Sequence, residues 1–313
     1  MTVAIPLILV VGPTAAGKSA LAVGLAERLG GEVVSADAMA VYRDMDIGTA
    51  KPSPAERARV PHHGVDMIPP EEPSDVARWL GWAEAAIADI HQRGRLAVVA
   101  GGTPLYTKAL LEGLSAGAPR DVQVRAALDA RYMSEGPEAL HAELTRVDPV
   151  YAAAHHANDQ RRIVRALEVF AVTGQPFSSF HVTDGTRRAS YRTLQIGVHW
   201  DRAILYQRIN ARTKQMFAAG LMDEVRALAP RLGNVARQAV GYKEVLDHLE
   251  GRCDLDMAIE QVKRHSRHLA KHQITWYKRF RDIHWLPGDA PDLLQQGEQL
   301  AREFLQLPYN KGT

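Results

Sequence analysis

The chain has 313 residues, of which 46% are hydrophobic and 24% are charged, a composition typical of a globular protein that buries a sizeable core. Its 38 basic residues nearly cancel its 36 acidic ones, so the net charge of +2 says little about partners, and the positions where basic residues cluster matter more. The single cysteine, Cys253, excludes an internal disulfide, and no apolar run approaches the roughly 18 residues of a membrane helix.

The first hundred residues alternate between predicted strands and predicted helices. Continuous apolar runs at 7–11 and 96–100 predict strands covered on both faces, and residues 32–36 are predicted as a further strand. Apolar residues at helical spacing predict helices over 19–29 and 76–92. Strands and helices in this alternation predict an α/β fold, with a parallel sheet flanked by helices.

The character of the chain changes in the middle. Residues 122–132, 137–145 and 159–172 are predicted helices, with no strand of similar quality among them. A strand follows at 194–200, and most of the chain beyond Asp201 reads as helical. We therefore predict an α/β core of residues 1–113 and 189–313, interrupted by a helical insertion domain at 114–188.

A phosphate-binding loop follows the first strand. The chain matches G-x-x-x-x-G-K-[ST] in the run Gly12, Pro13, Thr14, Ala15, Ala16, Gly17, Lys18 and Ser19. Glycines let backbone N–H groups curl around phosphate oxygens, and the helix that follows adds its positive end. Lys18 is expected to supply a charge to the phosphates, and Ser19 a hydroxyl to magnesium.

The loop predicts phosphate binding without naming a reaction, and the default for a P-loop protein is transfer of a γ-phosphoryl group. Against that default, the strand at 96–100 ends in Gly101-Gly102 where a magnesium-binding aspartate is expected. The acid stands instead at the end of the second strand, as Asp37. Because strand carboxyl ends face the ligand crevice of a parallel sheet, Asp37 is expected near the phosphate loop.

Several blocks of sequence resemble the tRNA dimethylallyltransferases, also called isopentenyl-diphosphate:tRNA transferases. They occur in the family's order along nearly the whole chain, at residues 35–52 (SADAMAVYRDMDIGTAKP), 62–66 (HHGVD), 101–111 (GGTPLYTKALL), 158–169 (NDQRRIVRALEV), 240–244 (VGYKE) and 269–276 (LAKHQITW). The chain departs from the family pattern at Ala38, Ala157 and His272, where serine, proline and arginine are usual. These departures remove no proposed catalytic group.

The resemblance implies a prenyl transfer. Dimethylallyl diphosphate would be held by the phosphate loop and magnesium, and the acceptor would be the exocyclic amine of the adenine 3′ of the anticodon. It also implies that Asp37 is the general base and that Thr103 and Arg125 lie near the reacting groups. The protein is expected to be cytoplasmic and monomeric, to bind a tRNA anticodon stem-loop, and to bind no membrane.

The resemblance also implies a set of tRNA-binding residues. It comprises Asp37, Ala38, Met39, Ala40, Thr103, Arg125, Arg161, Arg162, Ile163, Val164, Arg165, Arg237, Gln238, Gly241, Tyr242, Lys243, Arg267 and Lys271. Independently of the family, residues 261–281 carry seven basic and no acidic side chains, with aromatics among them, as expected of a surface that follows a nucleic-acid backbone. The alternatives are a solvated helix face at 261–281, and intrahelical pairing of Arg161 or Arg162 with Asp159 or Glu168.

The histidine pairs 62–63 and 155–156 lack a further ligand at the spacing of a zinc site, so hydrogen-bonding roles are preferred. Asp66 is a secondary candidate for indirect support of a magnesium ion. Two alternatives to the prenyl transferase remain: a P-loop small-molecule kinase, and an RNA-binding protein without catalytic activity.

Overall fold

The computed structural model describes residues 4–114, 119–181 and 189–306. They divide into two compact units, Met1–Leu111 with Ala189–Thr313, and Glu112–Arg188. The predicted insertion at 114–188 differs from the second unit by two residues at its start.

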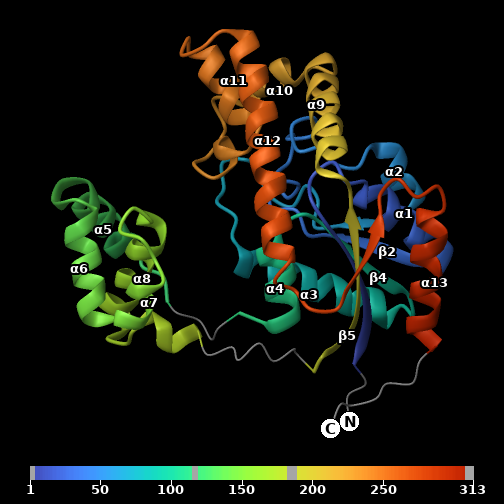
Figure 1. Cartoon of the computed structure of the whole chain (residues 1–313), viewed down its shortest axis with the longest axis horizontal. Helices are drawn as coiled ribbons and strands as arrows, with labels where there is room; N and C mark the ends of the chain where they lie inside the picture. The colour runs from blue at the N-terminus through green and yellow to red at the C-terminus, as the bar shows by residue number, and fades with distance from the viewer. Residues whose placement is uncertain (1–3, 115–118, 182–188, 307–313) are drawn as a thin grey trace. The chain divides into compact units, whose positions relative to one another are not determined.

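The first unit is built on one parallel sheet of six strands in the order β3-β2-β4-β1-β5-β6 (Figure 1). The strands are listed here: β1 Ile5–Val11, β2 Gly31–Ser35, β3 His62–His63, β4 Leu96–Ala100, β5 Tyr191–His199 and β6 Ile283–Pro287. All of the pairings are parallel, which confirms the predicted fold class. With β4 and β5 as its neighbours, β1 lies inside the sheet, where both of its faces need apolar cover.

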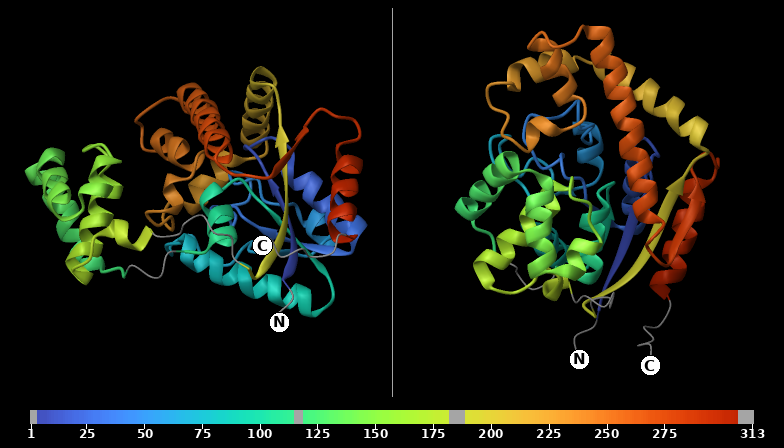
Figure 2. Two further views of the ribbon diagram at one scale, coloured as in Figure 1. Left: turned by 60° about the horizontal axis from the view of Figure 1, so that its bottom comes forward. Right: turned by 60° about the vertical axis from the view of Figure 1, so that its left-hand side comes forward.

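Alternate residues of β1 face two separate cores, because successive strand side chains point to opposite faces. Leu7 and Leu9 pack in the core that also contains the buried side chains of α3 (Val76–Gln92) and α4 (Pro104–Glu112). Ile8 and Val10 pack with α1 (Lys18–Leu29) and α13 (Leu293–Gln306). The two layers of helices are visible on either side of the sheet in Figure 2.

Four α-helices of the first unit lie between β5 and β6 in the described chain: α9 Arg202–Ala218, α10 Leu221–Leu228, α11 Tyr242–Leu249 and α12 Leu255–Tyr277. They lie toward the carboxyl ends of the strands, where β5 points in Figure 1. Asp201 and Asp254 begin α9 and α12, each accepting hydrogen bonds from N–H groups of the first turn. The short α2 (Pro54–Arg59) and a 3₁₀ turn at Ala236–Gln238 complete the unit.

The second unit is helical throughout its described part, with α5 Val122–Glu135, α6 Pro137–Val147, α7 Pro149–Ala153, α8 Gln160–Thr173 and a 3₁₀ turn at Phe177–His181. Leu140, Leu144 and Ile163 are fully buried in its core. The helical character of this segment was predicted from its spacing of apolar residues.

Two strands were missed by the sequence-based prediction. Strand β6 lies at the sheet edge and is only partly buried, so it lacks the continuous apolar run that predicted β1 and β4. Strand β3 has only two residues, both polar. Neither carries a signal that could distinguish it from a loop.

No helix in the described part of the chain combines the length and the apolar character required to span a bilayer.

Candidate active site

The loop between β1 and α1 has the backbone of a phosphate cradle. Gly12, Ala15 and Gly17 all have positive φ angles, of 141°, 62° and 96°. Gly12 also approaches the neighbouring strand so closely that a Cβ there would lie 2.7 Å from the carbonyl oxygen of Val198. The loop therefore needs glycine at position 12 both for its conformation and for its packing.

Side chains from distant elements hold this loop from outside. Trp200 Nε1 donates to Ala16 O at 2.9 Å, and Arg208 Nε donates to Ala15 O at the same distance. The Arg208 guanidinium also lies over the Trp200 ring, 4.1 Å from its centroid. Since these two contacts engage carbonyl groups, they do not occupy N–H groups of the loop.

Asp37 follows β2 and folds into a turn. Its Oδ1 accepts hydrogen bonds from Met39 N at 2.8 Å and from Ala40 N at 3.3 Å, the pattern of an aspartate that caps its own chain. Thr103 Oγ1 accepts a hydrogen bond from Ala38 N at 3.1 Å. Asp37 and Thr103, from the ends of two adjacent strands, are thus fixed in one polar group, as their place in a parallel sheet predicts.

A cavity of about 540 Å³ joins the phosphate loop to this polar group. Lys18, Asp37 and Thr103 line it, together with Arg212 from α9. Its other walls are largely apolar and include Ile209, Met216, Val262 and Leu269. The cavity therefore offers a cationic region, a carboxylate and an apolar surface to one ligand.

Burial and, to a smaller extent, the nearby charge of Arg212 lower the pKa of the Lys18 ammonium to about 8, while the charge of Asp37 opposes the shift. Lys18 Nζ donates to Pro13 O at 2.6 Å. Arg212 Nη1 lies 3.4 Å from Thr14 Oγ1, which brings a second cation to the loop. Two cations this close repel each other, so an anion between them would be stabilised.

The donor set fits a magnesium ion that arrives with a phosphate ligand. The Ser19 hydroxyl is exposed and lines the cavity. Among the described residues, no group of three or more histidine, cysteine, aspartate or glutamate side chains is arranged to hold a metal. Mg²⁺ typically keeps several waters and takes its remaining ligands from one or two protein oxygens and the substrate phosphates, which matches a single hydroxyl beside a phosphate loop.

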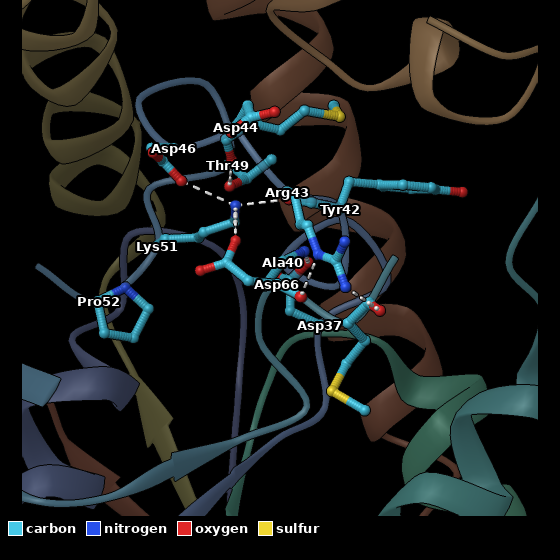
Figure 3. A network of polar contacts seen from close by, with 12 residues as sticks. Asp37, Ala40, Tyr42, Arg43, Asp44, Asp46, Thr49, Lys51, Pro52 and Asp66 are labelled. Carbon is cyan, nitrogen blue, oxygen red and sulfur yellow. Dashed lines mark hydrogen bonds and ion pairs between the residues drawn. The ribbon is translucent and has the colours of Figure 1, made fainter. Parts of the chain in front are cut away.

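Residues 48–52 form another part of the cavity wall, and the buried Lys51 holds this segment through the polar contacts drawn in Figure 3. The Lys51 side chain is 1% exposed, and its Nζ donates to Asp46 Oδ1 at 2.8 Å, Asp66 Oδ1 at 2.5 Å and the Tyr42 carbonyl. Arg57 donates to the other oxygen of Asp66. Both carboxylate oxygens of Asp66 are paired in this way, so Asp66 stabilises the loop. Its position gives no support to the suggested indirect role at a magnesium ion.

Tyr242 packs against the same segment, residues 48–52, at Gly48. Its side chain is fully buried against Gly48, where an added Cβ would lie 2.3 Å from the ring. Its hydroxyl donates to Glu224, whose carboxylate also accepts from the N–H groups of Asp46, Ile47 and Gly48. Burial and the bond to Glu224 raise the pKa of Tyr242. Its predicted contact with tRNA is therefore wrong for the side chain in this conformation.

The other predicted residues of the segment 237–243 differ in accessibility. Gln238 lines the cavity, Lys243 is exposed, and Gly241 is buried at the start of α11. Arg237 is partly exposed, 3.7 Å from Glu250. On α12, Lys271 is exposed, whereas Arg267 is partly buried and donates to Asn210 Oδ1 at 2.7 Å.

The predicted residues of the second unit form a local ion cluster. Glu168, 1% exposed, lies 2.9 Å from Arg165 and 3.7 Å from Arg125. Arg162 pairs with Asp159 at 2.8 Å, which is one of the local ion pairs considered as an alternative to tRNA contact. Arg161 is exposed.

Ile163 and Val164 are buried in the core of the second unit, so direct side-chain contact with tRNA is wrong for both. Their position on the apolar face of α8, beside Ala166 and Leu167, explains the burial.

Both histidines of the pair 62–63 make hydrogen bonds within the protein. His63 Nε2 lies 2.7 Å from the buried carboxylate of Glu32, and His62 Nδ1 lies 2.7 Å from Val60 O. This agrees with the preference for hydrogen-bonding roles over a zinc site.

Arg212 and Gln273 are among the polar residues of the cavity that sequence reasoning missed. The i, i+4 spacing of Arg208 and Arg212 predicts a shared helix face, but nothing in the sequence shows which element that face meets. Gln273 lies inside a recognised block, yet its buried position against the phosphate loop appears only in the fold.

A phosphate-binding loop, a second cation and a carboxylate around one partly apolar cavity define a P-loop enzyme for transfer of a group from a phosphate-bearing donor. The comparisons with known proteins narrow this class. A family model described as IPP transferase matches residues 40–280, and one described as isopentenyl transferase matches residues 5–60. The chain belongs to the family of tRNA dimethylallyltransferases, also called tRNA isopentenylpyrophosphate transferases.

Individual relatives agree over nearly the full length. A tRNA dimethylallyltransferase of Syntrophobacter fumaroxidans is 44% identical, covering 98% of this chain and 90% of its own. The tRNA isopentenylpyrophosphate transferase of Bacillus halodurans matches in structure with a TM-score of 0.72 and 40% identity, over 96% and 97% of the two chains. A eukaryotic dimethylallyltransferase acting on tRNA has a TM-score of 0.84 and 28% identity, over 98% and 81%. Family membership supports prenyl transfer and not the kinase alternative.

Proposed function

We propose that this protein transfers the dimethylallyl group of dimethylallyl diphosphate to the exocyclic amine of the adenine 3′-adjacent to the anticodon in tRNA, releasing diphosphate. The observation that carries the proposal is the single cavity lined by both the phosphate loop and Asp37. Relatives named as tRNA dimethylallyltransferases support tRNA as the acceptor molecule and a dimethylallyl group as the group transferred.

The cationic part of the cavity suits the leaving group. As the bond between the prenyl carbon and the diphosphate oxygen breaks, negative charge grows on the diphosphate, and Lys18 and Arg212 are placed to stabilise it. Magnesium held by Ser19 would neutralise further oxygen charge when bound. The apolar walls formed by α9 and α12 suit the five-carbon group and exclude water from it.

Asp37 suits the role of general base. The hydrogen bonds from Met39 N and Ala40 N both go to Oδ1, so the turn can be maintained while Oδ2 accepts a hydrogen bond from a substrate N–H. The amine nitrogen attacks the prenyl carbon, the carbon–oxygen bond breaks, and the proton of the amine passes to Asp37. Such base catalysis is typically worth 10²- to 10⁴-fold, and an adenine amine needs it because its lone pair is delocalised.

The acceptor must leave its base stack to reach this cavity, as in other enzymes that modify a base. Lys271 and Arg264 are exposed on α12, whose inner residues line the cavity, so the helix is suited to hold phosphates of the anticodon stem-loop. In the second unit, Arg125, Arg162 and Arg165 are proposed to add phosphate contacts by exchanging their present carboxylate partners for RNA. The exposed Arg161 is proposed to add a further phosphate contact.

The test is a transfer assay with labelled dimethylallyl diphosphate, magnesium and unmodified tRNA, with labelled ATP in parallel. The expected result is label in the tRNA, lost when adenine is replaced at the position 3′ of the anticodon. Release of phosphate from ATP with no label in tRNA would refute the proposal in favour of a kinase. Stoichiometric tRNA binding without transfer would support the non-catalytic alternative.

A further inference from the structure

One buried carboxamide joins the two halves of the cavity. Gln273, on α12, is 6% exposed. Its Oε1 accepts a hydrogen bond from Thr14 N of the phosphate loop at 2.8 Å, and its Nε2 donates to Gly102 O, at the end of β4, at 2.7 Å. These groups are separated from Gln273 by 259 and 171 residues along the chain.

The Gly102 side of this bridge leads to Asp37. Thr103, the next residue, accepts from Ala38 N and donates its own N–H to Ala36 O at 3.3 Å. Gly101 packs so tightly on the same backbone that an added Cβ would lie 2.1 Å from Ala36 O. A displacement of Gly102 would therefore be passed directly to the turn that holds the base.

The Thr14 side leads to the diphosphate site. Thr14 is part of the cradle, and its hydroxyl lies 3.4 Å from Arg212. A Cβ added at Gly102 would lie 2.6 Å from Gln273 Nε2 and 3.6 Å from Lys18 Nζ, so the carboxamide and the ammonium converge beside the same backbone. Tyr277, one turn further along α12, also approaches this backbone, with its hydroxyl 3.4 Å from Gly101 O.

We propose that Gln273 is a positioning residue that sets the distance between the diphosphate cradle and the general base. This inference rests on the proposed function and adds a residue to it. A carboxamide meets the requirement because one end of it accepts and the other end donates, matching a backbone N–H on one loop and a carbonyl on the other. The bond to Gly102 O is buried and the bond from Thr14 N is partly buried, so a side chain that made only one of them would leave the other loop with an unsatisfied polar group.

The expected size of the effect follows from the geometry. The donor carbon and the base act on one acceptor atom, and a displacement of about 1 Å in such an arrangement can lower the rate 10²-fold. Gln273→Met keeps the length of the side chain and loses both hydrogen bonds. Its kcat is expected to fall about 100-fold, with affinity for tRNA unchanged.

Gln273→Glu separates positioning from general stability. A protonated glutamate has the same acceptor and donor as glutamine, whereas an ionised one presents only acceptors and faces the Gly102 carbonyl unfavourably. The ratio of its kcat/KM for the donor to that of the wild type should therefore rise as pH falls. The corresponding ratio for Gln273→Met should stay constant with pH, because methionine does not titrate.

The experiment measures transfer by the full-length wild type, both variants and Thr275→Val over a range of pH, with tRNA and inorganic diphosphate affinities measured separately. Thr275 is the matched control, since it is exposed and, within the part of the chain that the structure describes, its hydroxyl bonds only to Lys271 O of its own helix. A pH-dependent recovery confined to Gln273→Glu would support the proposal. Wild-type kcat in Gln273→Met, or parallel pH profiles for the two variants, would overturn it. A wild type without transfer activity would instead refute the proposed function.

Discussion

Replacing Asp37 by asparagine should separate its two roles, which the geometry makes distinguishable. The asparagine oxygen can still accept the N–H groups of Met39 and Ala40, so the turn is preserved, but the second oxygen becomes an NH₂ group that cannot take a proton. Asp37→Ala removes both the turn and the base. The two variants should thus differ in stability and resemble each other in the rate of chemistry.

The magnitude follows from these contacts. Loss of general base catalysis should lower the single-turnover rate about 10²- to 10⁴-fold, or about 2.7–5.4 kcal/mol at 1.36 kcal/mol for each factor of ten. Loss of the two backbone hydrogen bonds in Asp37→Ala should lower the free energy of unfolding by about 1–3 kcal/mol more than in Asp37→Asn.

The assay is single-turnover transfer from labelled dimethylallyl diphosphate at saturating enzyme, with the tRNA dissociation constant and urea unfolding measured on the same preparations. Affinity for tRNA should stay near that of the wild type in Asp37→Asn. A rate for Asp37→Asn within about threefold of the wild type would refute the base assignment, because that change is too small for general base catalysis.

Four further results are expected. Burial and then the Arg212 charge lower the pKa of Lys18 to about 8, so its ammonium should lose its proton as pH rises through that value. The KM for the donor should therefore increase near pH 8. A donor KM that stays constant up to the ordinary pKa range of lysine would contradict this expectation. Arg212→Met should raise the donor KM at least about tenfold in steady-state assays, as expected for a lost charged contact to phosphate, and an unchanged KM would exclude that contact. Lys51→Met should lower the free energy of unfolding in urea by about 2 kcal/mol, because it removes a 1% exposed ammonium from two carboxylates that are themselves partly exposed. Equal stability of variant and wild type would mean that the ion pairs of Lys51 with Asp46 and Asp66 contribute no net energy. Lys271→Gln should reduce the salt dependence of tRNA binding by about 0.7–0.9 in the slope of log K against log salt, and an unaltered slope would place this residue away from RNA.

Local features of the sequence predicted much of the core. The strands at 7–11 and 96–100 were recognisable because each is buried on both faces and therefore apolar throughout. The edge strand β6 was not, since a half-exposed strand need not be apolar. The phosphate loop was recognisable for a related reason: the backbone angles at Gly12 and Gly17 restrict which residues can stand there.

The residues assigned to tRNA contact show where sequence reasoning was insufficient. Ile163 and Val164 lie among the predicted contacts, yet both are buried, and the apolar spacing of α8 was the available signal. Tyr242 had no such signal, because its burial depends on Gly48, which is 194 positions earlier in the chain and leaves room for the ring.

By itself, the sequence determined the α/β class, the phosphate loop with Lys18 and Ser19, and the acid at position 37, because each depends on neighbouring residues and on the period of their side chains. The tertiary structure alone placed Arg212 and Gln273 in the cavity and enclosed Lys51 between two carboxylates. Those contacts join segments far apart in the chain, and their formation depends on how helices α9 and α12 pack over the ends of the strands, which no local pattern encodes.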